Sequence, residues 1–192
     1  MKFQEIKKKL KTKTVGIAGC GGLGSNCAVA LARVGIGKLI IADFDKIEES
    51  NLNRQYFFWD QIGKIKSDTL KENIESINPE VEVISHNVFV DEYNFKALFK
   101  ECDLIIEAFD KPESKEMIVK AMSKFFPEKT LIMGIGMSGW GENDSIKETK
   151  YDNLIICGDQ KSEVSDGLPP LAPRVGMVAN MQANVALEIL LK

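Results

Sequence analysis

The stretch VGIAGCGGLGSN, residues 15–26, decides the fold, because a short apolar run leads there into a group of glycines. The leading residues are small and apolar, as expected for a parallel strand that is buried on both faces. Gly19, Gly21 and Gly24 fit the spacing G-x-G-x-x-G, which gives a tight turn, room for a phosphate and close packing of helix on strand. We expect Ser25 and Asn26 to open a helix whose free N–H groups and dipole favour an anion.

A second strand pattern at residues 38–42 supplies the context that a glycine fingerprint needs. It ends in Asp43, which lies 19 positions after Gly24. At this spacing a carboxylate can accept both hydroxyls of a ribose. Strand, glycine turn, helix and acidic strand end together favour a nucleotide site over a purely structural turn. A loop or helix-cap carboxylate is the alternative for Asp43.

Strand and helix patterns alternate along most of the chain. This alternation predicts an α/β fold, namely a doubly wound, Rossmann-like, mostly parallel sheet with helices on both faces and ligands at the carboxyl ends of the strands. At 192 residues a single domain spanning 1–192 is expected, with an N-terminal helix or arm at about 1–12. The predicted strands are 14–18, 38–42, 81–85, 104–108, 130–134 and 153–157, and the predicted helices are 25–34, 64–77, 92–100, 114–126 and 172–191.

Composition and charge exclude several classes of protein. A formal charge of −3, from 25 basic and 28 acidic residues, argues against a nucleic-acid binder. The basic run at residues 7–13 is read as a solvated face, with a contact to phosphate or to an acidic partner as the alternative. No stretch is apolar enough for a membrane span and no signal peptide is evident. Four cysteines without a C-x-x-C pair argue against zinc and favour the reducing cytoplasm.

Three charged residues favour a triphosphate ligand over a dinucleotide. The polar stretch 43–55 is long for a connection between strand and helix, which suggests a function. Arg54 and Lys66 display cations just past the expected nucleotide pocket, and a triphosphate needs more such charges than a pyrophosphate does. Asp110 follows the strand at 104–108 and can hold Mg²⁺ together with phosphates and waters. Each residue alone could be a solvated charge, but their shared edge of the sheet favours a site.

The combined motifs closely resemble the ThiF/MoeB/HesA superfamily, which includes the ubiquitin-activating enzymes. The resemblance runs from about residue 14 to residue 135. The C-terminal runs APRVG at 172–176 and MQAN at 181–184 look like the short ThiF-type branch. The motifs that carry the likeness are GxGGLGSN at 19–26, DFD at 43–45, NLxRQ at 51–55, Lys66 and Asp110.

The resemblance implies a nucleotidyltransferase that uses ATP and Mg²⁺ to adenylate the C-terminal Gly-Gly carboxylate of a small β-grasp sulfur carrier protein. In the ThiF-type branch this carrier is ThiS, and the pathway is thiamine (thiazole) biosynthesis. Asp43 would bind ribose, Asn51 would help to hold the triphosphate, and Asp110 would bind the metal. The implied catalytic residues are Arg54, Lys66 and Asp110, and the implied nucleotide-binding residues are Gly19, Gly21, Gly22, Leu23, Gly24, Asp43, Asp45, Asn51, Arg54, Gln55 and Lys66.

The chain departs from the family pattern near its N-terminus. Many members form dimers in which an arginine before the first strand reaches the partner subunit's triphosphate. The first 32 residues here contain no arginine, although a homodimer is still expected. A lysine could substitute, without the bidentate fork of arginine. The candidates are Lys7, Lys9, Lys11 and Lys13.

Two further segments have open interpretations. Some family members use a cysteine of the crossover loop for a covalent link to the carrier, but Cys157 is expected to be a small core residue. Residues 166–170 and the glycines around Met137 and Trp140 could line a groove for an extended Gly-Gly tail. An ordinary surface loop is the alternative for residues 166–170 and for the glycines around Met137 and Trp140. His86 is expected to be structural.

Three rival functions remain open at this point. The carrier could be MoaD-like rather than ThiS-like. The glycine fingerprint could serve a NAD-dependent oxidoreductase, although Arg54 and Lys66 and the absence of an evident proton donor tell against it. The chain could also be a non-catalytic module that binds a nucleotide without turnover, which the missing N-terminal arginine favours.

Overall fold

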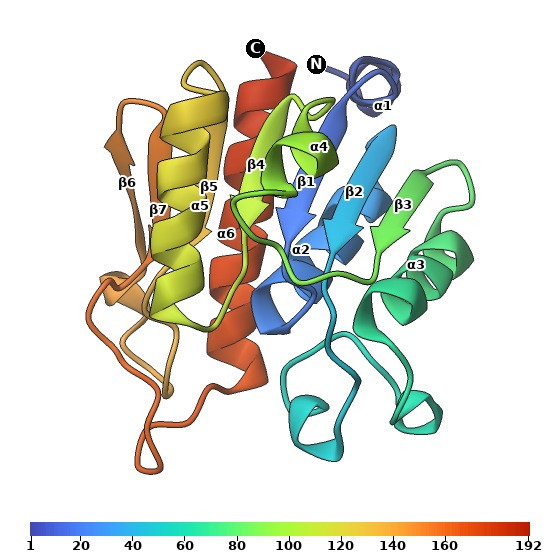
Figure 1. The fold of residues 1–192 in the computed structure, drawn as a ribbon. Coiled ribbons are helices and arrows are strands. Elements are labelled where there is room, and N and C mark those ends of the chain that lie inside the picture. Colours follow the sequence, from blue (N-terminus) through green and yellow to red (C-terminus); the bar gives the residue numbers. More distant parts are fainter.

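The structure, a computed structural model, describes residues 1–192 as one seven-stranded sheet covered by helices on both faces (Figure 1). The strands are β1 (Thr14–Ala18), β2 (Lys38–Ala42), β3 (Glu82–His86), β4 (Leu104–Glu107), β5 (Thr130–Gly134), β6 (Lys147–Tyr151) and β7 (Leu154–Gly158). The helices are α1 (Phe3–Leu10), α2 (Gly22–Val34), α3 (Lys66–Ile77), α4 (Phe95–Phe99), α5 (Pro112–Phe125) and α6 (Ala172–Leu191), with 3-10 turns η1 (Glu49–Asn51), η2 (Trp59–Gln61) and η3 (Asn143–Ser145).

The strand order β3-β2-β1-β4-β5-β7-β6 confirms the doubly wound, Rossmann-like class. All neighbouring pairs are parallel except β6 and β7, which are antiparallel at one edge. In Figure 1 the arrowheads of the parallel strands point to the lower edge, and both termini lie at the upper edge. The carboxyl ends of β1, β2 and β4 therefore meet at one edge, where such folds bind their ligands.

Two separate apolar clusters pack on the two faces of the sheet. Alternate residues of β1 divide between them: Val15 and Ile17 belong to the larger cluster, with α2, α3 and α6, whereas Ala18 belongs to the smaller one. The smaller cluster is built on α4 and α5 and contains Phe95 and Phe99 at its centre. Covering both faces explains why the central strands read as continuous apolar runs.

Several boundaries differ from those that the sequence predicts. Helix α2 begins at Gly22 rather than at residue 25, and Ser25 is not its cap: its hydroxyl donates to the Gly21 carbonyl oxygen at 2.6 Å. The helix predicted at 92–100 shrinks to α4, because Asp91 and Asn94 fold the preceding residues into a turn. Strand β6 was not predicted, because its KETKY sequence is charged and mostly exposed. No helix combines the length and the apolar character needed to cross a bilayer.

Candidate functional site

The glycine turn after β1 leaves a row of backbone donors open. Gly19 has a φ of +99°, and a Cβ there would lie 2.7 Å from the Ala108 carbonyl oxygen. A Cβ at Gly24 would lie 1.9 Å from the Gly19 carbonyl oxygen, so the helix can pack on the turn only with glycine at this position. The N–H groups of residues 21–24 have no acceptor, and no side chain caps α2. Open N–H groups at a helix N-terminus form a site for an anion.

Asp43 braces this turn from the end of β2. Its Oδ2 accepts the N–H of Cys20 at 2.6 Å, and its Oδ1 accepts the N–H of Asp45 at 2.8 Å. Burial raises the pKa of Asp43, whereas these two hydrogen bonds and the Lys66 charge oppose the shift. A carboxylate has acceptor capacity beyond two bonds. Asp43 is thus a loop carboxylate that keeps free acceptor capacity, so its role in the turn leaves ribose binding open as a prediction.

Lys66 and Asp45 form an ion pair beside the turn. Lys66 is the first residue of α3, and its side chain is only 8% exposed. Its Nζ lies 3.0 Å from Oδ2 of Asp45, whose side chain is 48% exposed. A cation at a helix N-terminus is opposed by the helix dipole, so a nearby anion stabilises it. A phosphate could share this cation with Asp45.

The NLxRQ motif places a second cation at the start of α2. The Arg54 guanidinium donates from Nη1 to the Ser50 carbonyl oxygen at 3.0 Å and to Asn53 Oδ1 at 2.8 Å, and it has no carboxylate partner. A Cβ at Gly22 would lie 3.5 Å from Cγ of Arg54, so this side chain runs along the glycine turn. Arg54 therefore lies beside the open N–H groups with its charge unneutralised.

The two amides of the motif behave differently. Gln55 is buried beside Gly21, and its Oε1 has no hydrogen-bond partner. Four other buried side-chain atoms of the chain also lack a partner, so it is the position beside Gly21 that makes Gln55 a candidate ligand contact. Asn51 is also buried, but its Oδ1 accepts the N–H of Glu48 and its Nδ2 donates to Ser50 Oγ, which holds η1 together. The structure thus brings Gln55 to the turn and engages Asn51 locally.

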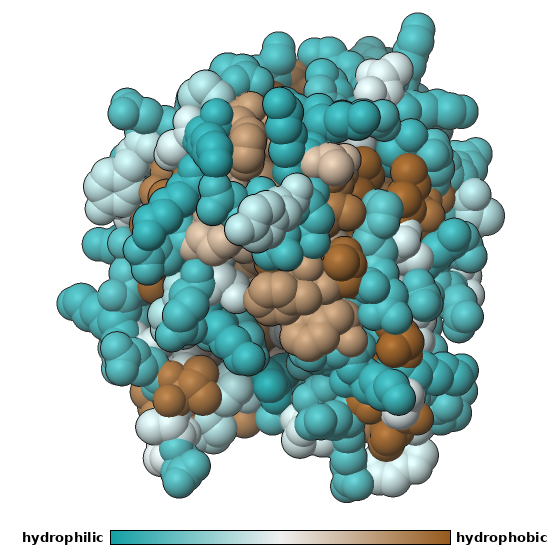
Figure 2. Space-filling model, viewed as in Figure 1, coloured by the Kyte–Doolittle hydropathy of each residue, from teal (hydrophilic) through white to brown (hydrophobic).

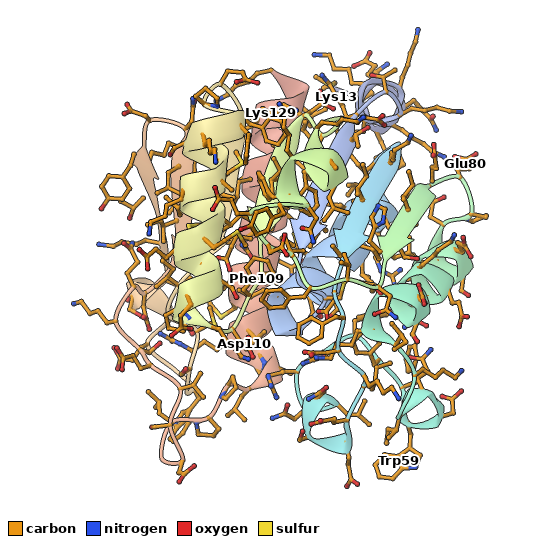
Figure 3. All side chains as sticks on the ribbon, viewed as in Figure 1. Lys13, Trp59, Glu80, Phe109, Asp110 and Lys129 are labelled. Atoms are coloured by element: carbon orange, nitrogen blue, oxygen red, sulfur yellow. The ribbon has the colours of Figure 1, made fainter.

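Asp110 lies at the same edge of the sheet, just beyond β4 (Figure 3). It is exposed, and its carboxylate makes no hydrogen bond or ion pair. No group of three or more acidic, histidine or cysteine side chains forms a ready metal cage. Mg²⁺ commonly takes one or two carboxylates and completes its shell with phosphates and waters. The free carboxylate of Asp110 fits that pattern when a nucleotide supplies the phosphates.

An aromatic pair that the sequence analysis missed stands beside Asp43. The rings of Phe44 and Phe89 meet edge to face, with centroids 5.3 Å apart, and their residues are 49% and 50% exposed. Phe109 lies next to Asp110 in Figure 3, and Figure 2 shows apolar surface at the corresponding place. Exposed aromatic faces can stack a nucleobase. The signal in the sequence was an aromatic residue directly after the ribose-binding candidate.

Of the other residues singled out by the sequence, the basic run lies away from this edge, whereas Cys157 and His86 stand at the carboxyl ends of β7 and β3. The basic run is at the opposite end of the molecule, where Lys13 appears in Figure 3. Lys7 pairs with Glu80 at 2.6 Å, and Lys9 donates to the Leu191 carbonyl oxygen, which suits a solvated face. Cys157 is fully buried, and burial raises its pKa to about 12, so its thiol is not activated. His86 ends β3, where its carbonyl oxygen accepts the N–H of Asp43.

An open glycine turn, a carboxylate at the next strand end and two cations at one edge of a parallel sheet define a nucleotide-binding domain of the Rossmann-like class. The sequence profile of the ThiF family matches residues 3–192, and the chain therefore belongs to the ThiF family. This result confirms the resemblance drawn from the motifs.

Two curated relatives illustrate the spread within the family. The chain is 32% identical over 194 residues to the adenylyltransferase and sulfurtransferase UBA4 of Eremothecium gossypii, covering 95% of this chain and 42% of that protein. It is 40% identical over 109 residues to the tRNA threonylcarbamoyladenosine dehydratase of Bacillus subtilis, covering 56% of this chain and 43% of that protein. The chain thus spans less than half the length of either relative.

A solved structure supports the fold over nearly the whole chain. The tRNA N6-threonylcarbamoyladenosine dehydratase of E. coli, crystallised with ATP, matches with a TM-score of 0.88 over 98% of this chain and 89% of that one. The two sequences are 21% identical, so the likeness concerns the fold.

Proposed function

We propose that the chain is an ATP- and Mg²⁺-dependent adenylyltransferase that activates the C-terminal Gly-Gly carboxylate of a small ThiS-like sulfur carrier in thiamine biosynthesis. The observation that carries this proposal is the set of unsatisfied anion-binding groups at one edge of the sheet. The N–H groups of residues 21–24 are open, Arg54 has no carboxylate partner, and Lys66 shares an exposed one. This set suits the charge of a triphosphate better than that of a dinucleotide.

The chemistry needs positive charge more than it needs a base. A carboxylate is already ionised at neutral pH. One of its oxygens attacks the α-phosphorus of ATP, a new P–O bond forms, and the bond to the bridging oxygen of pyrophosphate breaks. Arg54, Lys66 and the N-terminus of α2 would offset the repulsion between the two anions and the charge of the departing pyrophosphate.

Orientation and a metal ion supply the remainder. Holding the carboxylate in line with the bond to pyrophosphate turns a bimolecular reaction into an effectively intramolecular one. Asp110 would hold Mg²⁺, which would supply Lewis-acid chemistry at the phosphates. Asp43 would fix the ribose, and the Phe44–Phe89 pair would give the base a stacking surface.

The ThiS-like carrier is favoured over two other carboxylates. A MoaD-like carrier is the nearest alternative, because its C-terminal tail has the same chemistry. A modified tRNA is suggested by the name of the Bacillus subtilis relative, but a formal charge of −3 disfavours a nucleic-acid substrate. We further propose that residues 1–192 act as one domain, that two copies form a homodimer, and that the four free thiols reflect the cytoplasm.

A NAD-dependent oxidoreductase and a non-catalytic nucleotide-binding module are the rivals from other classes. ATP with Mg²⁺ should raise the melting temperature, and NAD should not. A larger shift with NAD would favour the oxidoreductase. A shift with ATP but no turnover with any carrier would favour the binding module.

Carrier-dependent exchange of pyrophosphate into ATP tests the proposal. Wild-type protein with a recombinant ThiS-type carrier should catalyse the exchange, and Asp110→Ala should abolish it. Because Asp110 is exposed and unpartnered, its replacement should change the unfolding free energy by less than about 0.5 kcal/mol. Glu128→Ala, an exposed acidic residue at the opposite edge, is the matched control. Wild-type exchange by Asp110→Ala would refute the assignment.

A further inference from the structure

Arg174 is a buried cation in the first turn of α6, where both burial and the helix dipole oppose it. Its side chain is 5% exposed, and that of its ion-pair partner Asp159 is 7% exposed. The guanidinium also donates to the Gly141 carbonyl oxygen and, at 3.0 Å, to Ser145 Oγ. A buried ion pair is weak evidence for stability, so its presence here calls for another reason.

The pair fastens two loops that follow neighbouring strands. We name them the β5 loop (residues 135–146) and the β7 loop (residues 159–171). Arg174 holds the β5 loop through Gly141 and Ser145, and it holds the β7 loop through Asp159. Oδ1 of Asp159 accepts the N–H groups of Lys161 and Ser162, both at 2.8 Å.

The two loops also contact each other directly. Asp159 donates its N–H to the Gly136 carbonyl oxygen at 3.0 Å, and a Cβ at Gly136 would lie 2.0 Å from Asp159 Oδ1. Farther out, the Gly139 N–H donates to the Pro169 carbonyl oxygen at 2.9 Å. Both loops leave the carboxyl ends of their strands, at the edge that also holds the glycine turn.

The first turn of α6 touches the nucleotide site through its other residues. Val175 Cγ1 lies 3.0 Å from where a Cβ would stand at Gly22. The Ala172 N–H donates to the Asn53 carbonyl oxygen at 3.1 Å, and Asn53 Oδ1 accepts from Arg54. One turn of helix thus contacts the phosphate-binding elements with some residues and anchors both loops with Arg174.

We infer that Arg174 is a positioning residue that fixes the β5 and β7 loops relative to the nucleotide, so that the acceptor carboxylate lies in line with the α-phosphorus. The inference rests on the proposed function for the identity of the acceptor. Near-attack geometry is demanding, and a displacement of about 1 Å can cost on the order of 10²-fold in rate. The buried Arg174 guanidinium hydrogen-bonds to both loops from α6. Hydrogen bonds of this kind are directional, so they allow one position of the loops relative to α6, whereas apolar contacts would allow several.

The test uses the double variant Arg174→Met/Asp159→Asn. It removes the buried charges together, so no uncompensated ion remains, and the Asn side chain can still accept from Lys161 and Ser162. Arg174→Lys is the conservative variant, since a lysine cannot serve both loops with a fork. The exposed pair Lys124–Glu92, replaced as Lys124→Met/Glu92→Gln, is the matched control.

Two measurements separate positioning from stability. Hydrogen exchange should accelerate at the amides of Gly139 and Asp159 in the double variant, and it should be unchanged in residues 19–34. ATP·Mg²⁺ affinity should stay within about two-fold, while kcat/KM for a recombinant ThiS-type carrier should fall by about ten-fold or more. Arg174→Lys should fall between the double variant and wild type, and the control pair should match wild type.

Each contrary outcome is decisive. Unchanged amide exchange in both loops would overturn the inference, and so would a parallel loss of ATP affinity and global stability. An unchanged kcat/KM for the carrier in the presence of loosened loops would also overturn it. If the wild-type protein turns over no carrier, the proposed function fails, whereas the exchange rates of the loop amides still decide whether Arg174 fixes the loops.

Discussion

The glycine-turn edge (residues 19–24 with Arg54 and Gln55) and the Arg174 junction (Arg174 with Asp159) lie on either side of the first turn of α6. They differ in how far their polar groups are hydrogen-bonded within the protein. At the glycine turn the N–H groups are open, Arg54 has no carboxylate, and Gln55 Oε1 has no partner. At the junction the two Nη atoms of Arg174 have acceptors on both loops and Asp159 accepts from three donors, and only Arg174 Nε is left without a partner. The glycine-turn edge thus leaves a row of polar groups open, whereas most polar groups of the junction are paired within the protein.

This contrast has a physical cause. An unpaired buried polar atom costs stability, so a row of open groups at one edge of the sheet indicates a place where a ligand or water can bind. A paired buried charge contributes little net stability, but it disfavours other arrangements of its neighbours. Substitutions in the two regions should therefore differ in kind: those at the open edge should affect turnover, and those at the junction should affect the geometry of the loops.

The largest effect is expected where the open edge depends on bare backbone. Gly24→Ala places a methyl group 1.9 Å from the Gly19 carbonyl oxygen, so the backbone must move. We expect a loss of about 3 kcal/mol or more in unfolding free energy, measured by urea denaturation. Gly176→Ala in α6 meets open space and should instead stabilise by about 0.5–1 kcal/mol. Equal stabilities for the two variants would refute the close packing of helix and turn.

Arg54→Ala tests the unpaired cation at the open edge. Removing a charge aimed at the developing phosphate charge should lower the exchange rate by on the order of 10²–10³-fold. Stability should change little, because Arg54 makes hydrogen bonds only to Ser50 and Asn53. Arg33→Ala, an exposed arginine of α2, is the control and should keep wild-type exchange. A rate for Arg54→Ala close to that of the control would remove Arg54 from the site.

A smaller, pH-dependent effect is expected at the Arg174 junction. Burial raises the pKa of Asp159, but the hydrogen bonds from Ser162, Lys161 and Arg174 prevail and lower it to about 2. Since unfolded aspartates titrate near pH 4, the stabilisation is complete above about pH 4 and is lost as the pH falls toward about 2. Over this range the wild type should lose about 2 kcal/mol more than Asp159→Asn. Parallel pH profiles would contradict the paired state of Asp159.

The smallest effect is expected at Cys157, which belongs to neither region. Its buried thiol has a pKa raised to about 12, so little thiolate forms at neutral pH. Cys157→Ala should keep the exchange activity, and the native wild-type protein should not react with iodoacetamide at this position. Peptide mass mapping of the alkylated protein checks the second point. A carrier-linked adduct at Cys157 would overturn this expectation.

The sequence predicts the central elements well because their signals are local. Strands β1, β2 and β5 and helix α6 have the predicted bounds, since they are apolar runs or a long periodic helix between glycines, prolines and polar residues. Helix α2 starts earlier than predicted, because the glycine turn itself takes the place of a cap. The sequence does not predict the edge strand β6, because its charged residues form a strand only by pairing with β7.

For the site, spacing along the chain predicts which edge carries the charges but not how they pair. Arg54, Lys66 and Asp110 all lie near carboxyl ends of the sheet, as the motif implies. The ion pair of Lys66 with Asp45 and the edge-to-face contact of Phe44 with Phe89 join residues from separate parts of the chain. The Arg174 junction likewise forms only when α6 returns to the ends of β5 and β7, so the APRVG run marks Arg174 in the sequence but does not predict its partners.

A crystal structure with ATP and Mg²⁺ tests the central claim most directly. The phosphates should accept the N–H groups of residues 21–24, with Arg54 and Lys66 within hydrogen-bond reach and Asp110 on the metal. The ribose should lie against Asp43. Adenosine bound elsewhere, or phosphates beyond the reach of these side chains, would contradict the account.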